Sequence, residues 1–250
     1  MEGRRRWGAA LLGAAEDLED AAAVFARPGP IEVGAVEAHA RRHAALFSDH
    51  LDAAENVHEA HELGGRLVER LSGALFVGVP ERGTVTFGGV LGRGGDGAWT
   101  LTVFGAANLR DGRDRVTATA SVTPLPGQPP PPPPQPLPQP RWTEESFGDD
   151  ALADVLDFLR GQPGWFELYK AFERMRDDVQ RRAGRGWEAI GGLDWPPKRE
   201  IDFFTESAQV HRHSRARRGR YDLSTAMPLD EAQRMVARLA RAWLAWRGAG

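Results

Sequence analysis

The sequence predicts an α+β fold in which two modules are joined by a proline-rich linker. The linker is the run PLPGQPPPPPPQPLPQP at residues 124–140, because proline lacks a backbone donor and enters neither a helix interior nor a central strand. Before it, residues 1–123 change from helical spacing of apolar residues to alternation, which predicts helices followed by a small antiparallel β-meander. After it, residues 141–250 keep helical spacing, which predicts an all-α bundle.

The composition is that of an ordinary globular protein, with 41% hydrophobic and 27% charged residues in a chain of 250. A net charge of −3 gives the whole chain no strong attraction for nucleic acid or for an acidic membrane surface. The chain has no cysteine, which excludes disulfides, thiolate nucleophiles and zinc sites built on sulfur.

The first residues, MEGRRRWGAALLGAAEDLED, have a basic head and a short apolar run, as a signal peptide does. The run is shorter than the roughly 7–15 apolar residues that a signal peptide needs, and Glu16 and Asp17 follow it. No run reaches the ~20 apolar residues that cross a bilayer. We therefore expect a cytoplasmic protein with no membrane partner.

In the first module, Ala-rich stretches at 9–26 and 35–72 have helical periodicity and are predicted to be helices. Ser48, Asn56 and the pair Gly64-Gly65 are candidate breaks in the second stretch. Beyond them the period becomes two, which predicts strands at TVTFGGVL (84–91), WTLTVFGA (99–106) and RVTATASV (115–122).

The glycines of GGVLGRGGDG (88–97) lie between two of these predicted strands. A phosphate-binding loop must lead from a strand into the N-terminus of a helix, so this segment is predicted to be a hairpin turn. The proline run is predicted to be a semi-rigid polyproline II spacer, and a docking site for a proline-reading domain is its alternative function.

Four helices are predicted in the second module. The first covers about 147–160 and the second about 164–183, where Trp165 and the apolar residues after it recur at steps of three and four. The third begins at Pro196-Pro197 and the last at Pro228, since proline suits the first turn of a helix.

Five of the seven histidines lie in the first module, within the stretch predicted to be helical: His39, His43, His50, His58 and His61. The i, i+4 spacing of His39 and His43 suits a shared metal, and HEAHE at 58–62 is one residue short of HExxH. Apolar residues share this face, so we interpret it as a packing face and expect neither a metal nor a cofactor.

The stretch HRHSRARRGR at 211–220 carries five arginines and no acidic residue. Three interpretations stay open: a solvated loop, a phosphate- or RNA-binding edge, and a catalytic centre. For the second, the candidate ligand-binding residues are Arg212, Arg215, Arg217, Arg218 and Arg220, whose guanidinium groups match phosphate oxygens in two-pronged hydrogen bonds.

For the third interpretation, the catalytic candidates are His211, His213 and Arg212. A histidine can act as acid or base on a ribose hydroxyl, and a nearby arginine can stabilise the phosphate charge. No GxSxG motif is present, so serine-based hydrolysis has no candidate nucleophile of that kind.

Three segments in order resemble bacterial helical domains of the HEPN type: GWFELYKAFERMRDDV (164–179), FFTESAQVHRHS (203–214) and MPLDEAQRMVARLARAWLAW (227–246). The resemblance covers about 100 residues of the second module. It implies a helical bundle, often dimeric, that acts on RNA in toxin, antiphage or RNA-processing systems, and it suggests an internal ion pair between Glu173 and Arg212.

The nuclease signature of that family, an arginine four to six residues before a histidine, does not occur at His211 or His213. We therefore expect a cytoplasmic bacterial binding or sensor protein, non-enzymatic, with RNA or a nucleotide as the candidate partner and a homodimer as the candidate assembly. The alternatives are a metal-independent ribonuclease and an adaptor that binds a protein partner through the proline run.

Overall fold

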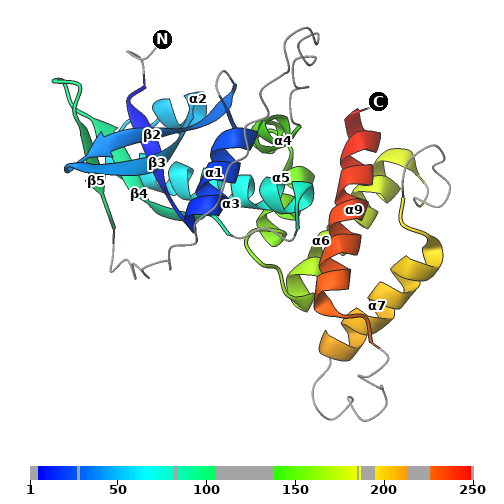
Figure 1. The fold of residues 1–250 in the computed structure, drawn as a ribbon. Helices are drawn as coiled ribbons and strands as arrows, with labels where there is room; N and C mark the ends of the chain where they lie inside the picture. The colour runs from blue at the N-terminus through cyan, green and yellow to red at the C-terminus, as the bar shows by residue number, and fades with distance from the viewer. Residues whose placement is uncertain are drawn as a thin grey trace, which may run out of the picture.

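The computed structural model of the chain combines eight helices with a five-stranded mixed sheet in the residues it describes, which is an α+β fold. Of Arg212 only the backbone is described. Figure 1 shows the sheet on one side, the helices α6, α7 and α9 on the other, and α3 and α5 between them. The described residues are 5–26, 29–80, 84–104, 138–184, 186, 195–212 and 226–248.

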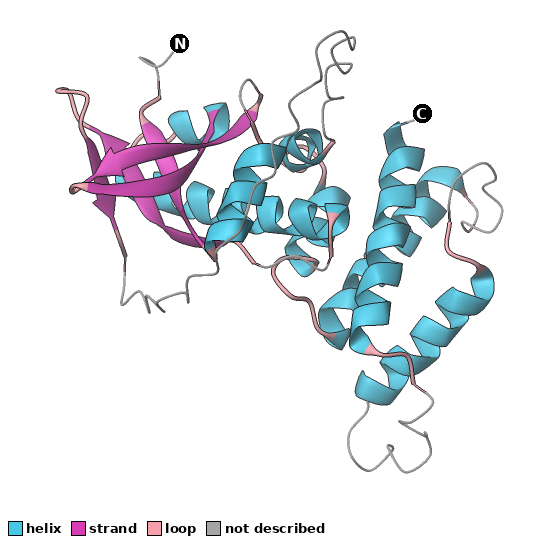
Figure 2. Cartoon of the chain, viewed as in Figure 1, coloured by secondary structure: helices cyan, strands magenta, loops and turns pink. Residues whose placement is uncertain are grey.

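The sheet closes on itself as a small barrel (magenta in Figure 2). Its order is β1-β3-β2-β5-β4, and β1 also pairs with β4. All neighbours are antiparallel except β2 and β5, which meet in parallel at one pair, Ala38 and Trp99. The strands are β1 (Trp7–Leu12), β2 (Ile31–Ala38), β3 (Arg41–Ser48), β4 (Thr86–Arg93) and β5 (Trp99–Thr102).

The predictions of a helix from residue 9 and of helical structure over 35–72 are wrong where β1, β2 and β3 lie. β2 and β3 form a hairpin whose turn residues, His39 and Ala40, have φ values of 50° and 58°. Such turns normally contain Asn or Gly, and this one does not. Alanine favours helices and is depleted in strands, so these Ala-rich strands resemble helices in the sequence.

Three helices complete the first half of the chain: α1 (Ala15–Val24), α2 (Asp49–Asp52) and α3 (Val57–Gly78). Ser48 and Asn56, which the sequence marks as breaks, are the N-caps of α2 and α3. The carboxamide oxygen of Asn56 accepts from the backbone N–H groups of His58 and Glu59, at 3.0 Å each.

α3 continues through Gly64, where the sequence suggests a break. A Cβ on Gly64 would lie 3.1 Å from the ring of Phe87 and 3.3 Å from Ala9. The missing side chain therefore lets α3 approach β4 and β1 closely. This contact, and not a turn, is the reason for the glycine.

The predicted strands at 84–91 and 99–106 correspond to β4 and β5, joined by the predicted glycine-rich turn. In this turn the N–H of Gly94 donates to the carbonyl of Ala98 at 2.8 Å, and Gly97 has φ 84°. β4 and β5 pair antiparallel as predicted, but they belong to a five-stranded mixed sheet and not to a separate meander. The predicted strand at 115–122 lies outside the described residues.

The second half of the described chain contains helices only. The predictions of helices near 147–160, over 164–183 and after Pro196-Pro197 and Pro228 are confirmed, with ends shifted by a few residues. One further helix, α4, takes in the last two residues of the predicted linker, of which residues 124–137 lie outside the described residues. The helices are α4 (Gln139–Glu145), α5 (Asp150–Phe158), α6 (Trp165–Ala183), α7 (Lys198–Arg212) and α9 (Leu229–Gly248).

The larger of two apolar clusters extends from the sheet through α3 into the second half of the chain. Leu67 and Leu71 of α3 and Leu152 and Leu156 of α5 are fully buried in it. Arg70 of α3 also donates to the carbonyl of Ser146 at 3.2 Å. α3 therefore packs against both the sheet and the helices after residue 138.

Candidate functional site

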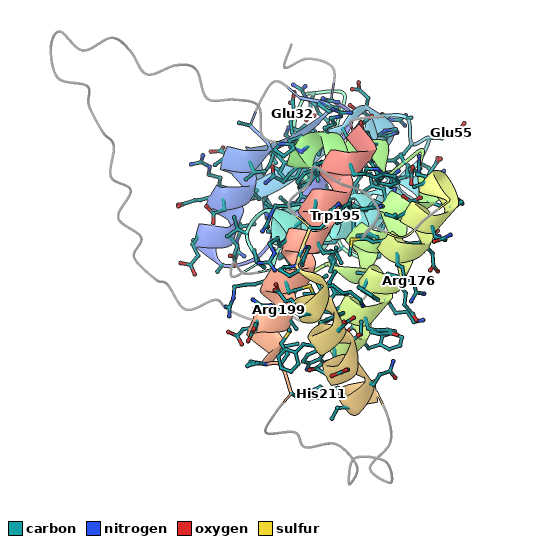
Figure 3. All side chains as sticks on the ribbon, turned by 90° about the vertical axis from the view of Figure 1, so that its right-hand side faces the viewer. Glu32, Glu55, Arg176, Trp195, Arg199 and His211 are labelled. Carbon is teal, nitrogen blue, oxygen red and sulfur yellow. The ribbon has the colours of Figure 1, made fainter. Side chains whose placement is uncertain are left out.

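The described part of the stretch singled out in the sequence is the last turn of α7. His211 is described completely, while His213, Arg215, Arg217, Arg218 and Arg220 lie outside the described residues, as does the Arg212 side chain. In Figure 3, His211 is at the lower end of α7, and Arg199 lies higher, near the start of the same helix. The candidate site is thus an end of the helical bundle.

His211 stacks on Trp165, the first residue of α6. Their ring centroids are 4.5 Å apart and their planes differ by 9°. Both side chains are half-buried. Because one face of the imidazole is covered by the indole, α6 contributes to the orientation of the His211 ring.

The stack lies on a buried aromatic cluster between α6 and α7. Phe204 of α7 is fully buried, and its ring centroid lies 5.6 to 6.5 Å from those of Trp165, Tyr169 and Phe172 of α6. These separations are typical of stabilising aromatic pairs. The Tyr169 hydroxyl accepts from the Gln209 side chain at 3.3 Å, so its polar end is also held by α7.

The end of the bundle also exposes apolar side chains. Phe166, next to Trp165, is 55% exposed, and Leu229, the first residue of α9, is 40% exposed. The Gln233 side chain donates to the carbonyl of Pro163 at 3.0 Å, which brings the start of α9 against the start of α6. The ends of three helices therefore meet where the chain leaves α7.

The predicted ion pair between Glu173 and Arg212 concerns a side chain outside the described residues. Within them, Glu173 accepts from the ammonium group of Lys170 at 2.9 Å, one turn earlier on α6. The helical i, i+3 spacing of these two residues is the signal that sequence reasoning missed.

The five histidines predicted to share one helix are distributed over the turn after β2, over β3, and over α2 and α3. His58 and His61 of HEAHE both pack against Phe104, with ring centroids 4.9 and 4.5 Å apart. Across the residues that the structure describes, no three histidine, aspartate or glutamate side chains gather as ligands of a metal ion.

The most buried charge in the described chain lies away from this end. Asp178 of α6 has a fully buried side chain that accepts from Arg181 at 2.7 Å, from Arg182 at 2.9 Å and from the indole N–H of Trp243 at 3.1 Å. Burial raises the pKa of Asp178, but the hydrogen bonds from Arg182 and Arg181 outweigh it and hold the pKa below its usual range. With every partner supplied by α6 or α9, this network holds those two helices together.

No protein-family model matches the sequence, and searches among curated proteins and solved structures found no significant match. The resemblance to HEPN-type domains therefore stays a prediction. No described helix is both long and apolar enough to cross a membrane.

Proposed function

We propose that this chain is a non-enzymatic, cytoplasmic bacterial protein that binds or senses RNA at the end of the helical bundle where α7 ends. The proposal rests on one observation, the stack of His211 on Trp165 directly before the arginine-rich residues 212–220. A stacked pair of aromatic rings therefore lies at the point where the arginine-rich stretch of the chain begins.

These two features match the chemistry of single-stranded RNA. Unpaired bases stack on aromatic and imidazole rings, and arginine donates to the phosphate oxygens in two-pronged hydrogen bonds. The exposed Phe166, adjacent to Trp165, supplies further apolar surface for a base. The acidic net charge of the chain is compatible with such a site, because the arginines are concentrated in one short stretch.

We favour binding over cleavage for two reasons. The sequence lacks the arginine-to-histidine spacing of the nuclease signature in the family it resembles. The His211 ring is also held face to face with an indole, an arrangement that suits recognition of a flat base. A ribonuclease that uses His211 or His213, and an adaptor without RNA affinity, would each give a different result in an RNA-binding assay.

The test is fluorescence anisotropy of a labelled oligouridylate with the full chain, at several salt concentrations and with EDTA, followed by electrophoresis of the same RNA. One variant replaces Arg215, Arg217, Arg218 and Arg220 with alanine. The control is Arg199→Ala, since Arg199 is exposed near the other end of α7 and pairs with no described residue.

Wild-type protein should bind the RNA intact, with an affinity that falls as salt rises. For every phosphate that an arginine no longer neutralises, the slope of log affinity against log salt should become shallower by about 0.7. EDTA-resistant cleavage that disappears in His211→Ala or His213→Ala would establish the ribonuclease instead. Neither binding nor cleavage would point to the adaptor, whose partner would have to be sought through the proline run.

A further inference from the structure

We propose that the tip of the β2–β3 hairpin, together with the start of β5, is a second surface that binds single-stranded nucleic acid. This surface, which we call the hairpin surface, consists of Arg41, Arg42, His43, Arg93 and Trp99. It adds to the proposed function a second binding surface for the same class of ligand. It rests on that function because both assume that the chain binds nucleic acid.

The strand register places most of the hairpin surface on one face of the sheet. Val36 pairs with His43 and Ala38 with Arg41, while Arg93 pairs with Trp99. Because Ala38 also pairs with Trp99 across the closure of the barrel, the indole lies beside the tip of the hairpin. On this face Ala38, Ala45, Phe47 and Leu91 are buried together with Trp99 packed against them, so it is the inner face of the closed barrel, and the hairpin surface lies at one end of the barrel.

The two arginines at the tip differ from most others in the described chain. Arg41 and Arg42 are exposed, and no described residue makes a hydrogen bond or ion pair with either guanidinium group. By contrast, Arg5 is held by Asp49 at 2.7 Å and by Asp52 at 3.0 Å. Charges without internal partners are the ones available to a ligand.

Among the described residues, the strand register and the β4–β5 turn place two acidic residues beside this surface. Glu37 pairs with Arg42 in the hairpin, so both lie on the face away from Arg41 and His43, with the carboxylate directly opposite Arg42. Asp96 lies in the β4–β5 turn, where its carboxylate accepts from the backbone N–H of Ala98 at 3.0 Å. The charge of the tip is therefore positive, although the chain as a whole is acidic.

Trp99 adds an aromatic surface to these cations. Its indole is half-buried, tilted against Phe47 with ring centroids 5.7 Å apart, and Arg93 lies over it at 5.9 Å from the ring centroid. Phe47 is fully buried, and its ring contact with the indole holds the indole in position. Cations beside an anchored aromatic ring bind the backbone and the bases of a single strand at the same time.

The hairpin holds this arrangement in place. His39 and Ala40 form a two-residue turn with positive φ at both positions, so the cross-strand pairs next to it cannot slip without breaking the turn. In Figure 1 the β2–β3 hairpin projects from the side of the sheet away from the helices. The hairpin surface therefore lies on a hairpin whose register is fixed, remote from the end of α7.

The test compares Arg41→Ala/Arg42→Ala with wild type in the anisotropy assay, with labelled oligouridylate and oligothymidylate as probes. We expect affinity to fall about five- to thirtyfold and the salt slope to fall by about 1.4, which corresponds to two phosphates at about 0.7 each. Arg199→Ala is again the control and should bind as wild type does. Trp99→Phe, which keeps an aromatic ring, should retain more affinity than Trp99→Ala.

The variant that lacks the arginines at 215–220 separates this inference from the proposed function. If that variant binds as wild type does while Arg41→Ala/Arg42→Ala is weakened, the site at α7 is wrong and the hairpin surface stands. If only the 215–220 variant is weakened, the hairpin surface is overturned. A wild-type chain that binds neither probe would overturn both.

A measurement on the wild-type protein tests the inference even if a variant misfolds. Photocrosslinking with a 4-thiouridine oligonucleotide, followed by peptide mass spectrometry, should label the peptides that contain 41–43 or 99. Crosslinks confined to other peptides would contradict the inference, whatever the variants do. Equal binding of the two probes would show that the surface does not read the ribose 2′-hydroxyl.

Discussion

Gly73 of α3 lies directly against the backbone of Leu156 in α5. A Cβ built on Gly73 would overlap the carbonyl oxygen of Leu156, so no side chain fits between the two helices at this crossing. The contact joins a helix of the first half of the chain to a helix that follows the proline run. It fixes how closely α3 and α5 approach each other.

Gly73→Ala should therefore destabilise the protein, although alanine favours a helix more than glycine does. Pushing the backbones apart typically costs about 1–3 kcal/mol. The measurement is the free energy of unfolding from denaturant titration. The control is Gly95→Ala, because no heavy atom lies within 4 Å of a Cβ at Gly95 and its stability should be unchanged. An alanine at 73 that leaves the stability unchanged would mean that α3 and α5 pack less closely than described.

Asp178→Asn should remove the buried charge that accepts hydrogen bonds from Arg181, Arg182 and the indole N–H of Trp243. Hydrogen bonds to charged groups typically stabilise by about 1.5–3 kcal/mol, so we expect a loss of about 2 kcal/mol at neutral pH. Asp177→Asn is the matched control, since Asp177 is exposed and, among the described residues, pairs only with its neighbour Arg176. Its effect should be below about 1 kcal/mol.

The same network predicts the acid sensitivity of the fold. Because the pKa of Asp178 is lowered in the folded state, its contribution is complete above the ordinary pKa of an aspartate and is lost as pH falls through the folded-state pKa. Asp149, whose carboxylate pairs with Arg182 and Arg247, has a lowered pKa as well, since these ion pairs and a backbone hydrogen bond from Leu152 outweigh its burial. The stability difference between wild type and Asp178→Asn should therefore shrink below about pH 5. A constant difference down to acid unfolding would rule out an ionised Asp178 as its source.

Ala40→Gly should stabilise the protein. Alanine at φ 58° carries the steric cost of the left-handed region, about 1–2 kcal/mol, which glycine does not. Ala35→Gly in β2 is the control and should destabilise by about 0.5–1 kcal/mol, because glycine weakens a strand interior. Thermal unfolding of the two variants should move in opposite directions. If both lose stability, the turn is not strained at residue 40.

His211→Phe should preserve RNA binding better than His211→Ala. Phenylalanine retains a flat ring that can stack on Trp165, whereas alanine removes it and frees the indole from its partner. Anisotropy with oligouridylate measures the difference, and the pH dependence of binding identifies any part played by the imidazole charge. Equal weakening by both substitutions would mean that the imidazole nitrogens, and not its face, contact the ligand.

The helices of the second half could be predicted from the sequence because their apolar residues recur at three and four positions. In α6, Leu168, Phe172 and Met175 follow this spacing and are all buried. Pro228 also indicates where α9 begins. Periodicity and proline are local signals, and they suffice where one face of a helix meets a core.

The barrel could not be predicted in the same way. Ala44 and Ala45 of β3 locally favour a helix over a strand, and the turn at His39 and Ala40 lacks the usual Asn or Gly. What makes these residues strands is pairing with β1 and β2, which local patterns in the sequence do not reveal. The partner of His211 was missed for a similar reason, since Trp165 is 46 positions away and its spacing on α6 suggested a purely internal role.

The apolar core that runs through α3 also has a consequence for synthesis. The ribosome completes α3 long before α5 and α9, so the face of α3 that Leu156 later covers stays exposed on the nascent chain while the whole proline run is translated. Contacts of such long sequence separation form slowly and late. We expect the apolar face of α3 to need protection from aggregation until the C-terminal helices emerge and close the core.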